Sequence, residues 1–140
     1  MSKKFGNFTI ESIMSSPPVV VHKETSVHEA ARIMFNNRIG SVLVVEDDGR
    51  LIGILTERDL VYLVASDKLH TASEMKVWHL MTENPITVKA NETIGDALSK
   101  MKEVNIRHLP VVNDEGKPIG IVSMRDILDY IISFLDLSFH

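Results

Sequence analysis

The stretch GILTERD at residues 53–59 returns as GIVSMRD at residues 120–126, with the glycine, the hydroxyl residue, the arginine and the aspartate in the same places. The same offset of 67 residues maps Met14 onto Met81, and it maps most apolar positions of the first copy onto apolar positions of the second without a gap. Self-similarity at a fixed period is the signature of repeated structural units. The sequence therefore predicts two copies of one supersecondary unit.

Each copy shows the same succession of secondary-structure signals. A β-branched run after a proline, PPVVVH at residues 17–22 or NPITVK at residues 84–89, predicts a strand. A capping-box spacing followed by apolar residues at helical intervals predicts a helix. Two apolar runs around the turn signals DDG or DEG then predict a hairpin, and a second helix is expected from Thr56 or Ser123.

These signals predict an α/β (α+β) fold made of two β-α-β-β-α repeats. Neither copy alone covers the apolar faces of its sheet and helices, so we expect the repeats to pack through their sheets about a pseudo-twofold axis. The predicted parts are a first repeat at 8–65, a linker at 66–74, a second repeat at 75–132 and an apolar C-terminal tail at 133–140.

Composition excludes several classes of protein. The 140 residues include no cysteine, which rules out disulfides and thiolate zinc sites and suits a reducing interior. The formal net charge of −4 argues against a general binder of nucleic-acid backbones. No apolar run has the length of a signal peptide core or a transmembrane helix, so we expect a cytoplasmic protein.

The repeated motif has one interpretation that is purely structural. Thr56 and Asp59, like Ser123 and Asp126, have the spacing of a helix N-cap and its reciprocal partner. Capping alone would explain these four residues.

A second interpretation starts from the arginines of the motif. Arg58 and Arg125 fall in the first turn of a helix, where a cation opposes the helix dipole. A bound anion would remove the conflict, and a helix N-terminus beside a hydroxyl and an arginine, with Gly53 or Gly120 permitting close backbone approach, suits a phosphate. The aspartate would then accept hydrogen bonds from ribose hydroxyls. The residues by themselves leave capping and nucleotide binding both open.

Three pairs of motifs resemble the cystathionine β-synthase (CBS) domain family. They are the openings IMSSPPVVV and LMTENPITV, the middle runs IGSVLVV and IRHLPVV, and the closing pattern G-h-h-T/S-x-R-D, where h is apolar. The chain resembles a tandem CBS pair, or Bateman module, from about residue 8 to residue 132. The resemblance implies a regulatory module that requires no cofactor and binds adenosine-containing ligands, with AMP, ADP and ATP favoured over S-adenosylmethionine and NAD.

The resemblance also implies two ligand clefts between the repeats. The first would be formed by Gly53, Thr56, Arg58, Asp59, Thr82, Ile86, Ile106, Arg107 and His108. The second would be formed by Gly120, Ser123, Arg125, Asp126, Ser15, Val19, Ile39, Gly40 and Ser41. The aspartates would hold ribose, the hydroxyl residues the phosphate-ribose edge, and the apolar strand residues the purine. Because Arg107 and His108 offer charge-assisted contacts, we expect the first cleft to bind a phosphorylated ligand more tightly.

Other functions find less support in the residues. The six histidines lack the spacing of metal ligands, and no nucleophile stands in a recognisable catalytic arrangement, so we expect neither a metal site nor an enzyme. The apolar C-terminal run YIISFLDLSF suggests a homodimer, and a regulatory module implies a further regulated protein. We expect no membrane partner. A protein-interaction adapter with empty clefts and, less favoured, a nucleic-acid binder are the alternatives.

Overall fold

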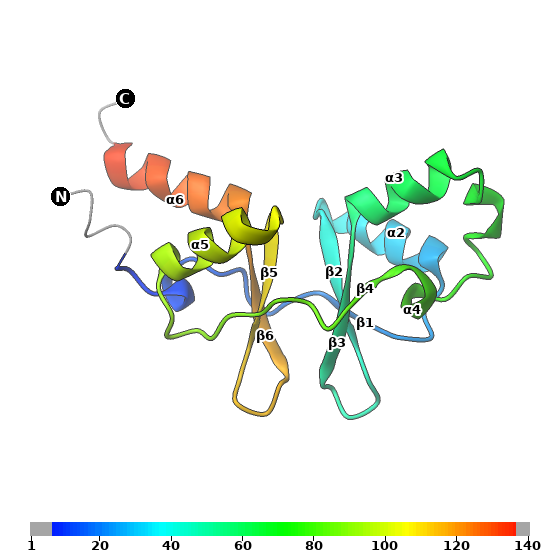
Figure 1. Cartoon of the computed structure of the whole chain (residues 1–140), viewed down its shortest axis with the longest axis horizontal. Helices are drawn as coiled ribbons and strands as arrows, with labels where there is room; N and C mark the ends of the chain where they lie inside the picture. The colour runs from blue at the N-terminus through cyan, green and yellow to red at the C-terminus, as the bar shows by residue number, and fades with distance from the viewer. Residues whose placement is uncertain (1–6, 137–140) are drawn as a thin grey trace. The chain divides into compact units, whose positions relative to one another are not determined.

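The computed structural model describes residues 7–136, which divide into two compact units (Figure 1). The first unit is the continuous segment Pro18–Pro85. The second unit combines the chain up to Pro17 with the chain from Ile86 onward. Within the described residues, no helix has both the length and the apolar character that a membrane crossing demands.

The first unit is a four-stranded sheet covered by helices on one side (Figure 1). Its elements are β1 (Val20–His22), α2 (Val27–Asn37), β2 (Ser41–Val45), β3 (Leu51–Thr56), α3 (Glu57–Ala65), the 3₁₀ helix η2 (Leu69–Thr71), α4 (Val77–Leu80) and β4 (Thr82–Glu83). The strands lie in the order β1-β2-β3-β4, with β1 parallel to β2 and the other neighbours antiparallel.

The second unit repeats this plan with fewer regular strands. Its elements are the 3₁₀ helix η1 (Ile10–Ser12), α5 (Ile94–Val104), β5 (His108–Val112), β6 (Pro118–Ser123) and α6 (Met124–Asp136). Strands β5 and β6 form an antiparallel pair, and single bridges add Val88 beside β5 and Ser15 beside β6. The two units confirm the predicted mixed α/β fold.

The strand predicted at NPITVK is wrong as a regular strand, because the structure reduces it to the bridge between Val88 and Val111. In the first unit, the Leu43 N–H donates to the carbonyl of Val19 at 3.1 Å. The residue that corresponds to Leu43 is Pro110, which has no N–H to donate. The pairing of this segment with β5 is therefore confined to the hydrogen bonds that Val88 makes with Pro110 and Val112.

The core of the second unit is completed by the segment that opens the first repeat. Ile10 in η1 is fully buried and belongs to the same apolar cluster as Ile94. Its N–H donates to the Glu92 carbonyl at 2.8 Å, and the Ile94 N–H donates to the Phe8 carbonyl at 2.8 Å.

The first unit mirrors this arrangement with the segment that opens the second repeat. Val77 in α4 is fully buried and its N–H donates to the Thr25 carbonyl at 2.8 Å, while the Val27 N–H donates to the Met75 carbonyl at 2.8 Å. Each core is thus closed by the helical turn at the start of the other repeat. The compact units therefore do not coincide with the repeats read along the sequence.

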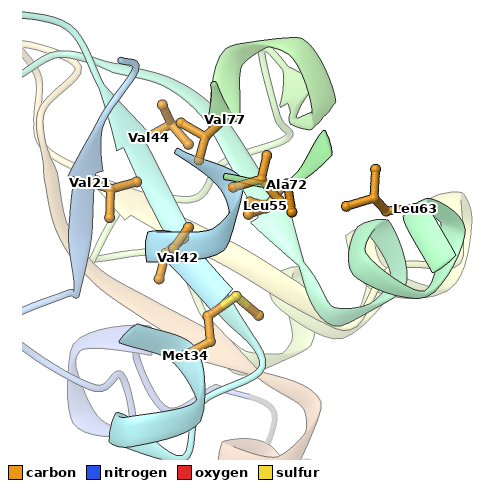
Figure 2. Close-up of a cluster of buried hydrophobic side chains, with 10 residues drawn as sticks. Val21, Met34, Val42, Val44, Leu55, Leu63, Ala72 and Val77 are labelled. Carbon is orange, nitrogen blue, oxygen red and sulfur yellow. The ribbon is translucent and has the colours of Figure 1, made fainter. Parts of the chain in front are cut away.

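Both cores are built from the apolar stripes predicted for the first helix of each repeat. In the first unit, Val27, Ala30 and Met34 of α2 are buried, and corresponding residues of α5 are buried in the second. Figure 2 shows how side chains from helices and strands meet in the first core. The residues labelled there are Val21, Met34, Val42, Val44, Leu55, Leu63, Ala72 and Val77.

Candidate functional site

In the first unit the repeated motif lies where β3 passes into α3. Thr56 ends the strand with an extended backbone, and α3 begins at Glu57. Thr56 and Asp59 form a capping box, in which Asp59 Oδ2 accepts hydrogen bonds from the Thr56 N–H at 2.8 Å and from its hydroxyl at 3.3 Å. Burial raises the pKa of the half-buried Asp59, although the Thr56 hydrogen bonds and the charge of the exposed Arg58 oppose the rise. The cap predicted by the structural interpretation is present.

The second unit builds the same cap between β6 and α6. The Ser123 N–H donates to Asp126 Oδ2 at 2.9 Å, and the Asp126 N–H donates to the Ser123 hydroxyl oxygen at 3.0 Å. Arg125 is exposed in the first turn, as Arg58 is in α3. In both caps the hydrogen bonds that are donated to the aspartate end on Oδ2. The other carboxylate oxygen, Oδ1, takes no part in capping.

The motif glycines lie inside strands, where another element crosses closely. A Cβ added to Gly53 would overlap the sulfur of Met81 and lie 2.9 Å from its Cγ. A Cβ added to Gly120 would lie 2.7 Å from the sulfur of Met14. A side chain at either position would displace a methionine side chain, and at Gly120 it would also lie 3.0 Å from the backbone oxygen of Ser15. These contacts support the structural interpretation of the two glycines. The repetition of both methionines at the same offset was the sequence signal for this contact.

The start of β2 lies against the start of α3 in the first unit. Ser41 is 5% exposed and pairs with Thr56 in the antiparallel register. The carbonyl of the preceding residue, Gly40, accepts a hydrogen bond from the N–H of Glu57 at 3.0 Å. Thr82 in β4 is exposed and pairs with Ile54 on the other side of β3. Three neighbouring strands thus carry a hydroxyl residue at or within two residues of the register position of Thr56.

In the second unit the corresponding positions carry cationic or titratable side chains. His108 pairs with Ser123, and the carbonyl of the exposed Arg107 accepts a hydrogen bond from the Met124 N–H at 2.8 Å. Ser15 is exposed and exchanges two backbone hydrogen bonds with Ile121, at 2.9 and 3.0 Å. The Asp126 cap is therefore bordered by an arginine and a histidine, where the Asp59 cap is bordered by a glycine and a serine.

Each predicted cleft draws residues from both units. The first unit brings together Gly53, Thr56, Arg58, Asp59 and Thr82 of the first set with Val19, Ile39, Gly40 and Ser41 of the second set. The second unit brings together Gly120, Ser123, Arg125, Asp126 and Ser15 of the second set with Ile86, Ile106, Arg107 and His108 of the first set. The grouping of these residues into two clefts stays a prediction.

One group of metal-ligand side chains was not singled out by the sequence, because its members are far apart along the chain. His22, Glu46 and Asp47 place their ligand atoms within 4.8 Å of one another. His22 Nε2 forms a hydrogen bond with Asp47, while His22 Nδ1 accepts one from the Glu24 N–H at 3.2 Å. In a neutral imidazole this puts the proton on Nε2, so the nitrogen that faces the carboxylates lacks the lone pair a metal needs.

The neighbourhood of this group also favours an ion pair over a metal. Lys23 Nζ lies 2.8 Å from a carboxylate oxygen of Glu46, and its hydrogen bond lowers the pKa of that glutamate. In the second unit, Lys89 and Asp114 stand at the positions of His22 and Asp47, and Lys89 Nζ lies 2.9 Å from Asp114. A lysine–carboxylate ion pair therefore takes the place of the His22–Asp47 hydrogen bond there.

The chain is similar to known proteins over most of its length. The family model described as the CBS domain matches residues 10–66 and 77–133. L-aspartate semialdehyde sulfurtransferase of Methanocaldococcus jannaschii is 33% identical over 118 residues, which are 84% of this chain but 22% of that protein. The chain thus spans about a fifth of the length of this curated relative.

Two solved structures have the same fold. The CBS domain pair of protein MJ0100, in complex with 5'-methylthioadenosine and S-adenosyl-L-methionine, is 31% identical with a TM-score of 0.82, covering 90% of this chain and 97% of that one. The CBS domain protein PAE2072 from Pyrobaculum aerophilum, complexed with AMP, is 27% identical with a TM-score of 0.79, covering 90% and 99%. With the family model matched twice and the repeated caps built alike, this chain belongs to the CBS domain family.

Proposed function

We propose that this protein is a regulatory module that binds an adenosine-containing ligand through the Asp59 and Asp126 caps. The observation that carries the proposal is the capping aspartate, formed twice with one carboxylate oxygen outside the cap. A carboxylate in that position accepts hydrogen bonds from the vicinal hydroxyls of ribose. Family members with this fold are known in complex with AMP and with S-adenosyl-L-methionine, whose common part is adenosine.

The surroundings of the caps supply the remaining contacts. The N-termini of α3 and α6 present backbone N–H groups and a positive dipole end to a phosphate. Arg58 and Arg125 are exposed beside them and add charge-assisted hydrogen bonds. The favoured ligands are AMP, ADP and ATP, because S-adenosylmethionine has no phosphate for these cations to bind.

The two predicted clefts are proposed to differ in affinity. The cleft assigned to Asp59 includes Arg107 and His108, whereas the cleft assigned to Asp126 includes Gly40 and Ser41. Charged donors form stronger hydrogen bonds to phosphate than neutral donors do. A phosphorylated ligand is therefore expected to bind more tightly at the Asp59 cleft.

Asparagine substitutions test the proposal without destroying the caps. In Asp59→Asn or Asp126→Asn the amide oxygen still accepts the capping hydrogen bond, but the second oxygen is replaced by a donor. Isothermal titration with AMP, ATP, S-adenosylmethionine and NAD is expected to show a roughly tenfold or greater loss of affinity in each variant, since hydrogen bonds to charged groups are involved. Unchanged affinity in both variants would refute the role of the aspartates. A larger loss from Asp126→Asn would refute the ranking of the clefts.

The output of the module is proposed to pass through a homodimer and a regulated partner protein. On α6, Leu128, Ile132 and Leu135 are 51%, 57% and 60% exposed at the spacing of one helix face. Val61 on α3, which the offset relates to Leu128, is 65% exposed. Apolar helix faces of this kind mark association surfaces. Ile132→Asp is expected to dissociate the dimer, as measured by sedimentation velocity, and a monomeric wild type would refute the proposal.

A protein-interaction adapter with empty clefts is the second candidate, because capping accounts for Thr56 and Asp59 without any ligand. The two candidates differ in whether an adenosine compound should stabilise the native state. A ligand present at about 100 times its dissociation constant stabilises the native state by roughly 2.7 kcal/mol. A thermal-shift panel of adenosine compounds that leaves the unfolding midpoint unchanged would favour the adapter.

A further inference from the structure

Met81 occupies the space that a side chain at position 53 would need. A Cβ on Gly53 would overlap its sulfur and would lie 2.9 Å from Cγ and 3.0 Å from Cε, whereas real Cβ atoms essentially never come closer than 3.0 Å to such neighbours. The methionine is half-buried and packs against the apolar core of the first unit. In this position its side chain fills the space beside Gly53, and a larger residue there would have to displace it.

Met14 has the same place in the second unit. A Cβ on Gly120 would lie 2.7 Å from its sulfur and 3.1 Å from its Cγ. The two methionines also share their backbone setting, because each ends a helical turn. The Met81 N–H donates to the Val77 carbonyl at 2.9 Å, and the Met14 N–H donates to the Ile10 carbonyl at 2.9 Å.

The residue after each methionine joins the sheet next to the motif glycine. Thr82 pairs with Ile54, the neighbour of Gly53, and Ser15 pairs with Ile121, the neighbour of Gly120. One peptide bond therefore separates the seated side chain from a hydroxyl residue assigned to a ligand cleft.

The register of this edge segment needs such an anchor. Strand β4 has two residues, Thr82 and Glu83, and both side chains are exposed. Strand register is well specified where one face is buried and weakly specified where both faces are polar. Burial of the strand's own side chains does not set its position here, whereas the methionine directly before it is half-buried against the core.

We propose that Met81 and Met14 are positioning residues, which set the register of the edge segments that carry Thr82 and Ser15. The link to ligand binding rests on the proposed function, in which these hydroxyls line the clefts. Seating each sulfur against its glycine holds the hydroxyl residue at one place along the sheet.

A double-mutant cycle tests the seating. Gly53→Ala is expected to lower the thermal unfolding midpoint by about 5 °C, because the added methyl group overpacks the space that Met81 fills. Met81→Ala also destabilises, by leaving a cavity. In the double variant the new methyl group enters the space left by the methionine, so its loss is expected to be clearly smaller than the sum of the single losses. Met34→Ala, which truncates a buried methionine of the same core, is the matched control and should add to Gly53→Ala.

Hydrogen exchange distinguishes positioning from simple core filling. The Asn84 N–H donates to the Ile52 carbonyl at 3.1 Å, just beyond β4, and reports on the register of that strand. Gly53→Ala is expected to speed its exchange roughly tenfold relative to core amides, and the double variant is expected to restore protection. Additive stabilities, or an Asn84 amide that exchanges as in the wild type when Gly53 is replaced, would overturn the proposal.

Ligand affinity provides the last readout, with AMP as the probe and all variants kept well below their unfolding midpoints. Gly53→Ala is expected to weaken AMP binding roughly fivefold, the loss of about one neutral hydrogen bond, and the double variant to recover it. Recovery of stability without recovery of affinity would remove the link to the ligand. If the wild type binds neither AMP nor S-adenosylmethionine, the proposed function fails, while the cycle and the exchange data still decide on the positioning role.

Discussion

Replacing Ile10 with alanine is expected to loosen the second unit, although Ile10 lies at the start of the first repeat in the sequence. Its side chain is 0% exposed and lies in the cluster that includes Ile94 and Met101 of α5. The truncation removes three carbon atoms, worth about 2.4 kcal/mol in transfer free energy. The unfilled cavity raises the total cost to roughly 3–4 kcal/mol, and the unfolding midpoint is expected to fall by about 10 °C.

Val77→Ala is the matched variant, because Val77 holds the corresponding place in the first unit and is also 0% exposed. It removes two carbon atoms and is expected to cost about 2–3 kcal/mol. The assay is native-state hydrogen exchange followed by mass spectrometry, with peptides from α2 and α5 as reporters of the two units. Ile10→Ala should reduce protection mainly in α5, and Val77→Ala mainly in α2. Loss of protection chiefly in α2 for Ile10→Ala would refute the exchange of segments between the repeats.

Three further predictions concern the caps, the shortened strand and the histidine group. Burial raises the pKa of Asp59, so its protonated form is favoured by folding and Asp59→Asn should gain stability relative to the wild type as the pH rises through the titration of the carboxyl. Hydrogen bonds from Thr93 lower the pKa of Asp96, so Asp96→Asn should lose stability relative to the wild type over the same rise in pH. Urea unfolding across pH checks both signs. Free energies of unfolding that change with pH in parallel for variant and wild type would contradict them. Pro110→Leu should supply the missing N–H and stabilise by about 1 kcal/mol, provided that the new amide at position 110 is protected in exchange; an unprotected amide would show that the strand does not lengthen. Zinc in excess should leave the unfolding midpoint unchanged, and a rise that His22→Ala abolishes would restore the metal interpretation.

Much of the candidate site was predictable because its signals are local. A hydroxyl residue three positions before an aspartate specifies a cap wherever a helix begins, and both caps formed as predicted. The two interpretations of the motif could not be separated in this way, because the same Asp59 serves a cap whether or not its second oxygen meets a ligand. Asp59 and Asp96 cap helices with the same sequence pattern, but burial raises the pKa of Asp59 whereas hydrogen bonds lower the pKa of the exposed Asp96. The pattern alone does not reveal this difference in burial.

The sequence by itself determined the helix-strand-strand-helix order common to both repeats, the apolar stripes of α2 and α5, and the repeat that relates the two units. These features follow from spacing along the chain, since hydrogen bonding in a helix start and the period of a helix face involve neighbours a few residues apart. Only the tertiary structure decided that Ile10 completes the second core and Val77 the first, because contacts between segments that lie 48 to 86 residues apart leave no local pattern. The loss of the strand at Val88 has the same origin. The sequence shows that Pro110 has no N–H, but this affects pairing only because the segment around Val88 lies beside it in the fold.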